Sequence, residues 1–578
     1  MYLEKINNPS DVKKLNLNEL NKLADEIRQV LLKKLSKHGG HFGPNLGMVE
    51  ATIALHYIFN SPQDKLIFDV SHQSYPHKIL TGRKDAFLYE DKYDDVTGYS
   101  CPDESEHDFF EIGHTSTSIS LAGGMAKARD LLHNKENIVA IIGDGSLSGG
   151  EALEGLDFAG EMNTNFIIVV NDNDMSIAEN HGGIYKNLKL LRETEGKAEL
   201  NIFKAMGLDY TFVKDGNNID MLIAAFDKVK DTSKPVVVHI VTQKGKGYPL
   251  AEKNRESWHW CMPFDLETGK PKYTFNKESY ADITAQYLLK KMQKDSSVCA
   301  ITSGTPTVFG FYKENREKAG PQFIDVGIAE EHAVALASGI AKNGGKPVYG
   351  VYSTFLQRAY DQLSQDVCLN SSPVTFLVFS ASIWGMNAAT HLGIYDIPMI
   401  SNIPKLVYLA PTCKEEYMAM LEWSVEQNEY PVAIRVPSND VISYNKNVIT
   451  DYSQLNKYQI TRNGSKVAVI PLGDFYQLGE KIAEQLDATL INPIYITGID
   501  QQLLCDLEKE HTVIVTIEDG IINGGFGEKI SAHYSKSKIK VLNYGFKKEF
   551  LNVDNPDEIM KENGITVENI VARVKELL

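Results

Sequence analysis

Two side chains that could bind a metal ion occupy matching places in this sequence, each shortly after an apolar run. Asp144 lies between two glycines after residues 138–142, and Asn173 lies after residues 166–170. Carboxylate and amide oxygens suit a hard cation such as Mg2+, and the glycines allow a phosphate group to approach the backbone. The pattern indicates a metal and diphosphate site, although a Gly-Asp-Gly sequence is equally typical of an ordinary turn.

The elements that position these two residues form a βαβ unit. Residues 138–142 and 166–170 are apolar and rich in β-branched side chains, and residues 152–162 between them have the apolar period of a helix. The strands of such a unit are parallel, and ligands bind beyond their carboxyl ends. Asp144 and Asn173 can therefore converge on one point.

The size and charge of the chain limit its class. At 578 residues it is too long for one core, and the usual domain size predicts roughly three or four domains. Its 59 basic and 76 acidic residues give a net charge of −17. This balance argues against a broad surface for nucleic acid or for anionic membranes.

The sequence favours a cytoplasmic location. The amino terminus has no apolar core of signal-peptide length, and no later run approaches the ~20 apolar residues that span a bilayer. Six cysteines are scattered without Cys-x-x-Cys pairs, which predicts neither a disulfide framework nor a zinc site. We expect small-molecule partners, and neither a nucleic acid nor a membrane.

Strand and helix patterns alternate in three blocks, which end near residues 268, 438 and 578. The first block carries a long amphipathic helix over residues 18–39, and each block carries at least four apolar strand patterns. Residues 244–275 are rich in Gly, Pro and charge, which predicts a connecting segment.

Further segments make the chain resemble a known family. They are residues 39–50, 69–83, 113–120, 325–341, 352–362 and 390–396. Together with the spacing from Asp144 to Asn173, they resemble the 1-deoxy-D-xylulose-5-phosphate synthase family of transketolase-like thiamine diphosphate enzymes. The resemblance runs in order over almost the whole chain and is weakest in the third block.

The resemblance implies an α/β fold with three doubly wound domains of transketolase-like architecture and mostly parallel sheets. It implies a diphosphate-binding domain over residues 1–268, a linker over 269–278, a pyrimidine-binding domain over 279–445 and a transketolase C-terminal-like domain over 446–578. A homodimer is also implied.

The resemblance assigns the cofactors, thiamine diphosphate and Mg2+, to particular residues. Asp144, Asn173 and the backbone carbonyl of Met175 would hold the metal. Glu330 would hydrogen-bond the cofactor's aminopyrimidine, because a protein base removes the thiazolium proton poorly by itself; an acid in the first turn of a helix is the structural alternative. The expected cofactor-binding residues are His72, Gly113, His114, Ser116, Asp144, Gly145, Ser146, Asn173, Glu330, Phe355 and Arg358.

Five histidines match the active-site positions of the family: His41, His72, His114, His259 and His391. Imidazole suits a reaction that moves protons near neutral pH. We expect His41, His72, His259 and His391 to be catalytic with Glu330, and His259 is the least secure because it lies in the predicted connecting segment. The expected substrate-binding residues are His41, Tyr352, Ser353, Asn387, His391 and Arg435.

The chain departs from the family where the substrate would bind. Two family arginines hold the phosphate of the acceptor aldehyde, and Ser380 and Ser438 stand at their places. Each charge-assisted hydrogen bond of this kind contributes roughly 1.5–3 kcal/mol. Arg358 and Arg435 remain. Each is a candidate for partial compensation and equally a candidate for a structural arginine in an ion pair. The chain is also shorter than the family between residues 180 and 209.

The implied reaction joins pyruvate to glyceraldehyde 3-phosphate, with loss of carbon dioxide, to give 1-deoxy-D-xylulose 5-phosphate for isoprenoid and thiamine synthesis. Two alternatives stay open. One is a transketolase-like carboligase with a different acceptor, for which an aldehyde without a phosphate is the candidate. The other is a cofactor-binding scaffold without catalysis. The presence of Glu330 in the same sequence as Asp144 and Asn173 argues against it.

Overall fold

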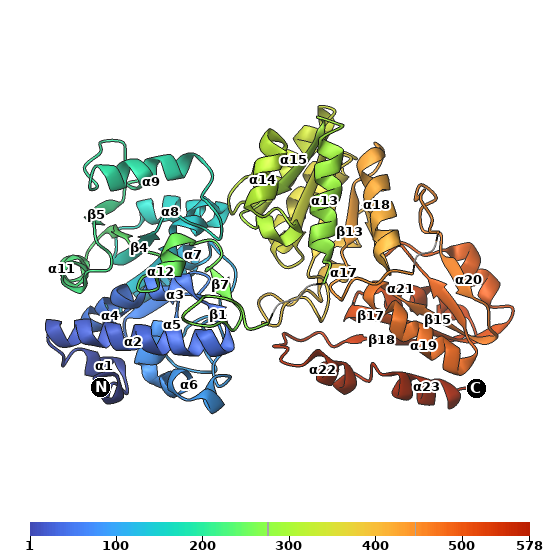
Figure 1. The fold of residues 1–578 in the computed structure, drawn as a ribbon, viewed down its shortest axis with the longest axis horizontal. Helices are drawn as coiled ribbons and strands as arrows, with labels where there is room; N and C mark the ends of the chain where they lie inside the picture. The colour runs from blue at the N-terminus through green and yellow to red at the C-terminus, as the bar shows by residue number, and fades with distance from the viewer. Residues whose placement is uncertain (274–276, 445–446) are drawn as a thin grey trace. The chain divides into compact units, whose positions relative to one another are not determined.

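The structure, a computed structural model, describes residues 1–273, 277–444 and 447–578. The chain forms two compact units, the first made of Met1–Phe275 with Gly327–Ala329 and the second of Asn276–Val326 with Glu330–Leu578 (Figure 1). Residues 274–276 of the predicted linker 269–278, and the predicted domain boundary at 445 and 446, lie outside the described residues.

A five-stranded parallel sheet forms the centre of the first unit. Its strand order is β2-β3-β4-β6-β5. The strands are β2 (Lys65–Phe68), β3 (Ile138–Gly143), β4 (Phe166–Asp172), β5 (Asp209–Val213) and β6 (Pro235–Val241). Helix α8 (Gly150–Glu161) joins β3 to β4, so the predicted βαβ unit is confirmed. The carboxyl ends of β3 and β4 consequently lie side by side.

Helices cover both faces of this sheet (Figure 1). Val139 and Ile141 of β3 pack with α4 (Val49–Ile58) and α11 (Ile219–Val229). The alternate residues Ala140 and Ile142 pack with α7 (Ser118–Leu131) and α8. Because successive side chains of a strand point to opposite faces, an uninterrupted apolar strand is the pattern required between two helical layers.

The segment predicted to connect the blocks folds back onto the first unit instead. Strand β7 (Trp260–Cys261) pairs with β1 (Gly40–His41), which follows the long helix α2 (Leu17–His38). The rings of Tyr248, Trp258 and Phe264 surround Phe42 at centroid distances of 5.0–5.5 Å. The connecting-segment prediction is therefore wrong for this stretch, because buried aromatic side chains offset its glycines and charges.

The second unit contains two sheets. The first is parallel, in the order β12-β13-β11-β10-β8-β9, and the second has the order β14-β16-β15-β17-β18 with only β14 antiparallel. The strands of the first sheet are β8 (Val298–Thr302), β9 (Phe323–Asp325), β10 (Lys346–Tyr352), β11 (Thr375–Phe379), β12 (Val407–Leu409) and β13 (Val432–Arg435). Those of the second are β14 (Gln459–Arg462), β15 (Lys466–Pro471), β16 (Thr489–Asn492), β17 (His511–Ile521) and β18 (Lys540–Phe546). The predicted mostly parallel α/β architecture is confirmed.

Helix α15 (Glu330–Lys342) packs on one face of the six-stranded sheet. Ala333, Val334 and Ala337 of this helix share a core with Tyr349 and Val351 of β10. Val348 of the same strand faces the opposite layer, formed by α13 (Tyr280–Met292) and α18 (Lys414–Glu426). This packing fixes the first turn of α15, where Glu330 stands.

All six cysteines are free in the structure. In the part of the chain that the structure describes, no helix is both long enough and apolar enough to cross a bilayer.

Candidate active site

Asp144 begins the turn that follows β3 and is 1% exposed. Its Oδ2 accepts hydrogen bonds from Asn180 Nδ2 at 2.8 Å and from the Met175 backbone N–H at 3.2 Å. Burial and, to a smaller extent, the nearby Asp172 together raise the pKa of Asp144 to about 8. A cation at this carboxylate would favour its ionised form.

Buried oxygen atoms surround the Asp144 turn. Asn173 Oδ1, Asn180 Oδ1 and Ser176 Oγ have no hydrogen-bond partner among the described residues. A Cβ on Gly145 would meet Ser176 at 3.0 Å, so this glycine allows the close approach of the two loops. Buried polar atoms are normally paired, and these therefore fit the role of ligand-binding groups.

A second layer of charges fixes the end of β4, next to Asn173. Asp172 accepts two hydrogen bonds from Arg192 at 2.7 and 2.8 Å and lies 2.9 Å from His239 Nε2. Arg192 belongs to α9 (Gly183–Glu193), and Arg255 donates to the Asn173 backbone carbonyl at 2.7 Å. Within the described residues, no three His, Cys, Asp or Glu side chains are arranged for a metal. A metal here would need amide, carbonyl and diphosphate oxygens.

Lys244 is a further candidate for the site that the sequence did not reveal. It is 2% exposed, and its Nζ donates to the Ser176 carbonyl at 2.6 Å. Burial lowers its pKa to about 7, while the nearby Asp144 opposes this shift. Lys244 follows β6 at the sheet edge where Asp144 follows β3, and this position after a predicted strand could have identified it from the sequence.

The loop containing Gly113, His114 and Ser116 lies next to the Asp144 turn. Ser116 Oγ donates to the Ser146 carbonyl at 2.8 Å, and a Cβ on Gly149 would lie 2.1 Å from that hydroxyl. The backbone N–H groups of Ser116 and Ser118 donate to the two oxygens of buried Asp69, each at 2.9 Å. The structure therefore brings this loop, with its expected cofactor-binding residues, to the carboxyl end of β3.

Three predicted histidines form one cluster in the first unit. The ring centroids of His41 and His72 are 5.0 Å apart, and His259 lies 5.8 Å from His41 and 5.2 Å from His72. Burial, with a smaller effect of Lys244, lowers the pKa of His41 to about 4 and that of His259 well below its ordinary value. The imidazoles of His41 and His259 are therefore neutral near pH 7.

Glu330 stands at the start of α15 and is 3% exposed. Burial raises its pKa to about 7, while Arg358, whose guanidinium lies 3.5 Å from the carboxylate, opposes this shift. A carboxyl group with this pKa can hold or release a proton near neutral pH.

Other expected residues gather elsewhere in the second unit. The Phe355 ring contacts those of Tyr352 and His391 at centroid distances of 5.3 and 5.5 Å. Ser353 is buried, and its Oγ lies 3.4 Å from the Ser380 carbonyl. Asn387 is exposed instead, and its backbone carbonyl accepts from Val553 N–H at 2.7 Å.

Arg435 has the ion-pair partners of its structural alternative. It is 4% exposed and binds Asp396 through Nε at 2.8 Å and Asp519 through Nη1. Its guanidinium is thus committed to two buried carboxylates, as in a structural ion pair. Ser438, one of the two replacements, donates its backbone N–H to Asp474 at 2.9 Å.

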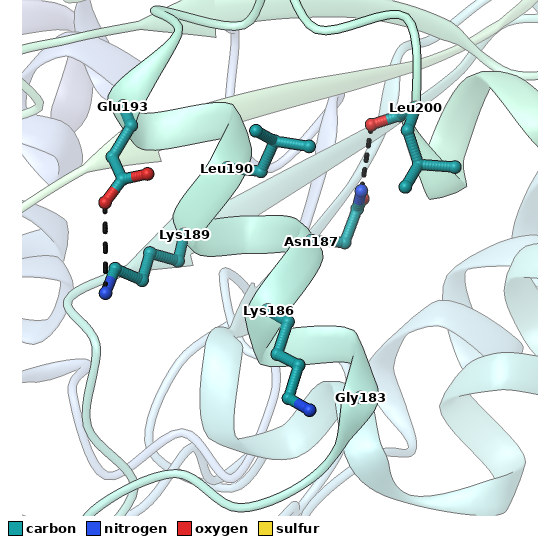
Figure 2. Close-up of a pocket in the computed structure, with 7 residues that line it drawn as sticks. All are labelled: Gly183, Lys186, Asn187, Lys189, Leu190, Glu193 and Leu200. Atoms are coloured by element: carbon teal, nitrogen blue, oxygen red, sulfur yellow. Dashed lines mark hydrogen bonds and ion pairs between the residues drawn. The ribbon is translucent and has the colours of Figure 1, made fainter.

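A surface hollow of about 470 Å3 lies along α9, in the stretch that is shorter than in the family (Figure 2). Lys189 pairs with Glu193 at 3.9 Å, and Asn187 donates to the Leu200 carbonyl at 2.8 Å. None of the predicted site residues lines this hollow, so it is separate from the chemistry described above.

Profiles of known families match nearly the whole chain. The profile described as 1-deoxy-D-xylulose-5-phosphate synthase matches residues 3–201, and the transketolase thiamine diphosphate binding domain matches residues 113–302. The transketolase pyrimidine binding domain and the transketolase C-terminal domain match residues 277–442 and 456–570.

Curated relatives align from end to end. The 1-deoxy-D-xylulose-5-phosphate synthases of Clostridium beijerinckii and Clostridium perfringens are 40% and 39% identical, and both alignments cover 100% of this chain and 99% of the relative. That of Caldanaerobacter subterraneus is 38% identical with the same coverage. The transketolase of Leishmania mexicana is 15% identical over 96% of this chain and 97% of its own, with a TM-score of 0.44. Because the identity to these relatives extends over the full length of the chain, this chain belongs to the 1-deoxy-D-xylulose-5-phosphate synthase family.

Proposed function

We propose that this protein condenses pyruvate with glyceraldehyde 3-phosphate, releases carbon dioxide and forms 1-deoxy-D-xylulose 5-phosphate. The observation that carries this proposal is the 40% identity, over the full length of both chains, to a relative with that name. The retained, buried Glu330 agrees with it, because a scaffold without catalysis has no need for a carboxyl group with a pKa near 7.

Thiamine diphosphate and Mg2+ are the proposed cofactors. Asp144, Asn173 and the Met175 carbonyl would hold the metal, and Lys244 would face the negative charge of the diphosphate. The buried, unpaired Asn173 Oδ1 and the buried Asp144 carboxyl support this assignment. When bound, the cofactor supplies a thiazolium carbon that attacks a keto group and an electron sink for decarboxylation.

The protein's own groups would hold and move the protons. Glu330, with a pKa of about 7, can keep a proton next to the cofactor's aminopyrimidine. The neutral imidazoles of His41 and His259 can donate one hydrogen bond and accept another without bringing a charge into the site. His72 lies in the same cluster and is proposed to act with them. His391, beside Phe355 in the second unit, is the fourth proposed histidine.

An aldehyde without a phosphate is the second candidate for the acceptor. Ser380 and Ser438 replace the arginines expected from the family, and Arg435 is committed to Asp396 and Asp519. None of these three residues therefore offers a guanidinium group to a phosphate dianion. The guanidinium of Arg358 lies next to the Glu330 carboxylate instead. Glyceraldehyde 3-phosphate nonetheless stays the first candidate because of the full-length similarity.

The acceptor experiment separates these candidates. Purified protein with thiamine diphosphate, Mg2+ and pyruvate is given glyceraldehyde 3-phosphate or unphosphorylated glyceraldehyde, and product mass and carbon dioxide are followed. The proposal expects faster turnover with the phosphorylated acceptor. A preference for glyceraldehyde favours the second candidate, and no carbon dioxide with either favours the scaffold. A homodimer, a cytoplasmic location and the domain limits given above remain proposals.

A further inference from the structure

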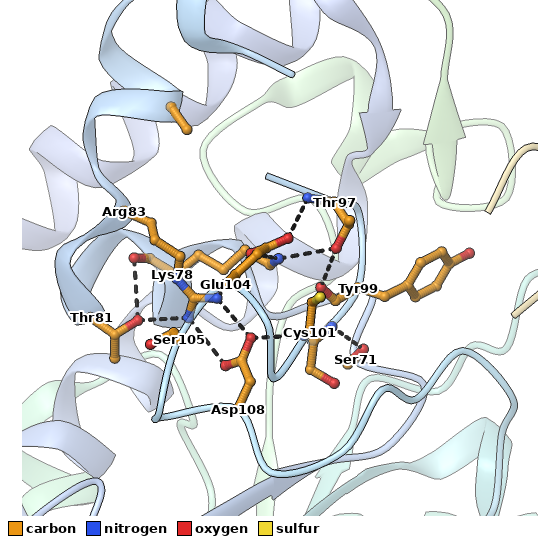
Figure 3. Close-up of polar contacts among 12 residues, drawn as sticks. Ser71, Lys78, Thr81, Arg83, Thr97, Tyr99, Cys101, Glu104, Ser105 and Asp108 are labelled. Carbon is orange, nitrogen blue, oxygen red and sulfur yellow. Dashed lines mark hydrogen bonds and ion pairs between the residues drawn. The ribbon is translucent and has the colours of Figure 1, made fainter. Parts of the chain in front are cut away.

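Four buried charges hold the segment from Thr97 to Asp108 against the first unit (Figure 3). The side chains of Lys78, Arg83, Glu104 and Asp108 are 0%, 9%, 12% and 1% exposed. Arg83 contacts Glu104 at 3.0 Å and Asp108 at 2.7 Å, and Lys78 contacts Glu104 at 2.5 Å. Two positive and two negative charges therefore balance in one network, which we call the charge cluster.

The charge cluster and its neighbours fix the backbone on both sides of Tyr99. Glu104 accepts a hydrogen bond from Thr97 N–H at 2.6 Å, and Asp108 accepts one from Cys101 N–H at 2.9 Å. Thr97 Oγ1 donates to the Tyr99 carbonyl itself at 2.9 Å. The path of this segment is therefore set by contacts that leave the Tyr99 ring uninvolved.

A further hydrogen bond ties the segment to the histidine cluster. The backbone N–H of Ser100 donates to Ser71 Oγ at 2.7 Å, and this hydroxyl donates to the Ile112 carbonyl at 2.6 Å. Ser71 precedes His72 in the chain and has a positive φ of 64°. The residues that flank Tyr99 and His72 are thus directly bonded to each other.

The Tyr99 ring lies against His41. The two ring centroids are 5.6 Å apart, with the planes at 67°. Figure 3 shows the ring projecting away from the charge cluster, and Tyr99 is only half-buried. The ring therefore contributes less to the core than a fully buried one would, and its edge-on contact with His41 places it at the rim of the histidine cluster.

We propose that Tyr99 is a positioning residue, which covers the His41 ring and holds it within the histidine cluster. The charge cluster supplies a fixed base for this contact. In some proteins buried ion pairs select one conformation of the chain rather than add net stability, and in this proposal the selected conformation is the one that presents Tyr99 to His41. The proposal rests on the proposed function only where turnover is concerned.

The direct test measures how fast diethyl pyrocarbonate modifies His41, by peptide mass spectrometry of the full-length protein. The reagent acylates accessible neutral imidazoles. Tyr99→Ala should speed the modification of His41 by roughly 3- to 10-fold, the range of an aromatic pair. Tyr99→Phe should leave it unchanged, because it keeps the ring. Exposed His133 serves as an internal control.

Two results would overturn the proposal. One is an unchanged rate at His41 in Tyr99→Ala. The other is a similar increase at His41 and His239 together, because His239 is buried in the first sheet and its exposure would mean general loosening. Neither result depends on turnover, so the test remains valid if the proposed reaction is wrong.

Turnover provides a second measurement. Tyr99→Ala should lower kcat with pyruvate by roughly 3- to 10-fold, and Tyr99→Phe should restore it. Tyr89→Ala is the matched control, because this tyrosine is 52% exposed. Equal activity of Tyr99→Ala and the wild type would contradict the positioning role. A wild type without turnover would count against the proposed function alone.

Discussion

Replacing Glu330 by Gln should change both the chemistry and the stability of the protein. The substitution keeps the shape of the side chain and removes the proton that it can exchange. We expect turnover to be lost while the cofactor still binds. The native carboxyl group is 3% exposed, and this burial makes the stability of helix α15 depend on pH. We expect the variant to lose that dependence, because its amide does not titrate.

The size and sign of this dependence follow from the pKa of Glu330. Burial raises this pKa from 4.5 to about 7, which corresponds to about 3 kcal/mol. Between these two pH values the folded state binds a proton that the unfolded state has released. The stabilising contribution of the protonated group is therefore complete below pH 4.5 and falls as the pH rises to about 7. The amide of the variant cannot titrate and should not show this fall.

Hydrogen exchange of α15, in protein without cofactor, measures this effect locally. The free energy of opening, corrected for intrinsic exchange, should fall with pH by about 3 kcal/mol more in the wild type than in Glu330→Gln. Glu331→Gln is the matched control, because it removes a carboxylate from the same helical turn and should keep the wild-type slope. Parallel slopes for the wild type and Glu330→Gln would refute the reasoning.

Three further changes test the other charged groups. Asp144→Asn should weaken the Mg2+-dependent binding of thiamine diphosphate by at least roughly tenfold in calorimetry, and an equal affinity would contradict the metal-ligand role. Arg435→Met should lower stability by roughly 3–5 kcal/mol in urea unfolding, because it leaves Asp396 and Asp519 without their shared cation; an unchanged midpoint would argue against the structural role. Lys244 loses its proton as the pH rises through about 7. The affinity of the wild type for magnesium pyrophosphate should therefore fall more steeply over this range than the affinity of Lys244→Met, and identical pH profiles would exclude Lys244 from the site.

The first sheet could be predicted well from the sequence. Strands β3 and β4 are buried between two helical layers, which requires uninterrupted apolar runs that are easy to recognise. Strands β5 and β14 were missed. Both lie at the edge of a sheet and are partly exposed, so they lack the apolar signal of the central strands.

The return segment after β6 shows a different limit. Its glycines and charges are typical of a loop, and they hid both Lys244 and the pairing of β7 with β1. That pairing brings His259 to His41, although the two histidines lie 218 positions apart in the chain. Contacts at this sequence distance leave no local pattern, and only the family resemblance pointed to His259.

Arg435 shows why the charge of a single residue is a poor guide to its role. A strand-end arginine near a predicted site suits a phosphate ligand. Its partners, Asp396 and Asp519, lie on separate elements and meet it only in the folded unit. The buried carboxylates, rather than the arginine, decide that it is structural.

The most direct test of the central claim is the mass of the product formed from pyruvate and glyceraldehyde 3-phosphate. With thiamine diphosphate and Mg2+ present, the protein should form 1-deoxy-D-xylulose 5-phosphate with an equal amount of carbon dioxide, and Glu330→Gln should form neither. A wild-type protein that binds the cofactor but yields no such product, or yields it equally well in the variant, would contradict the account.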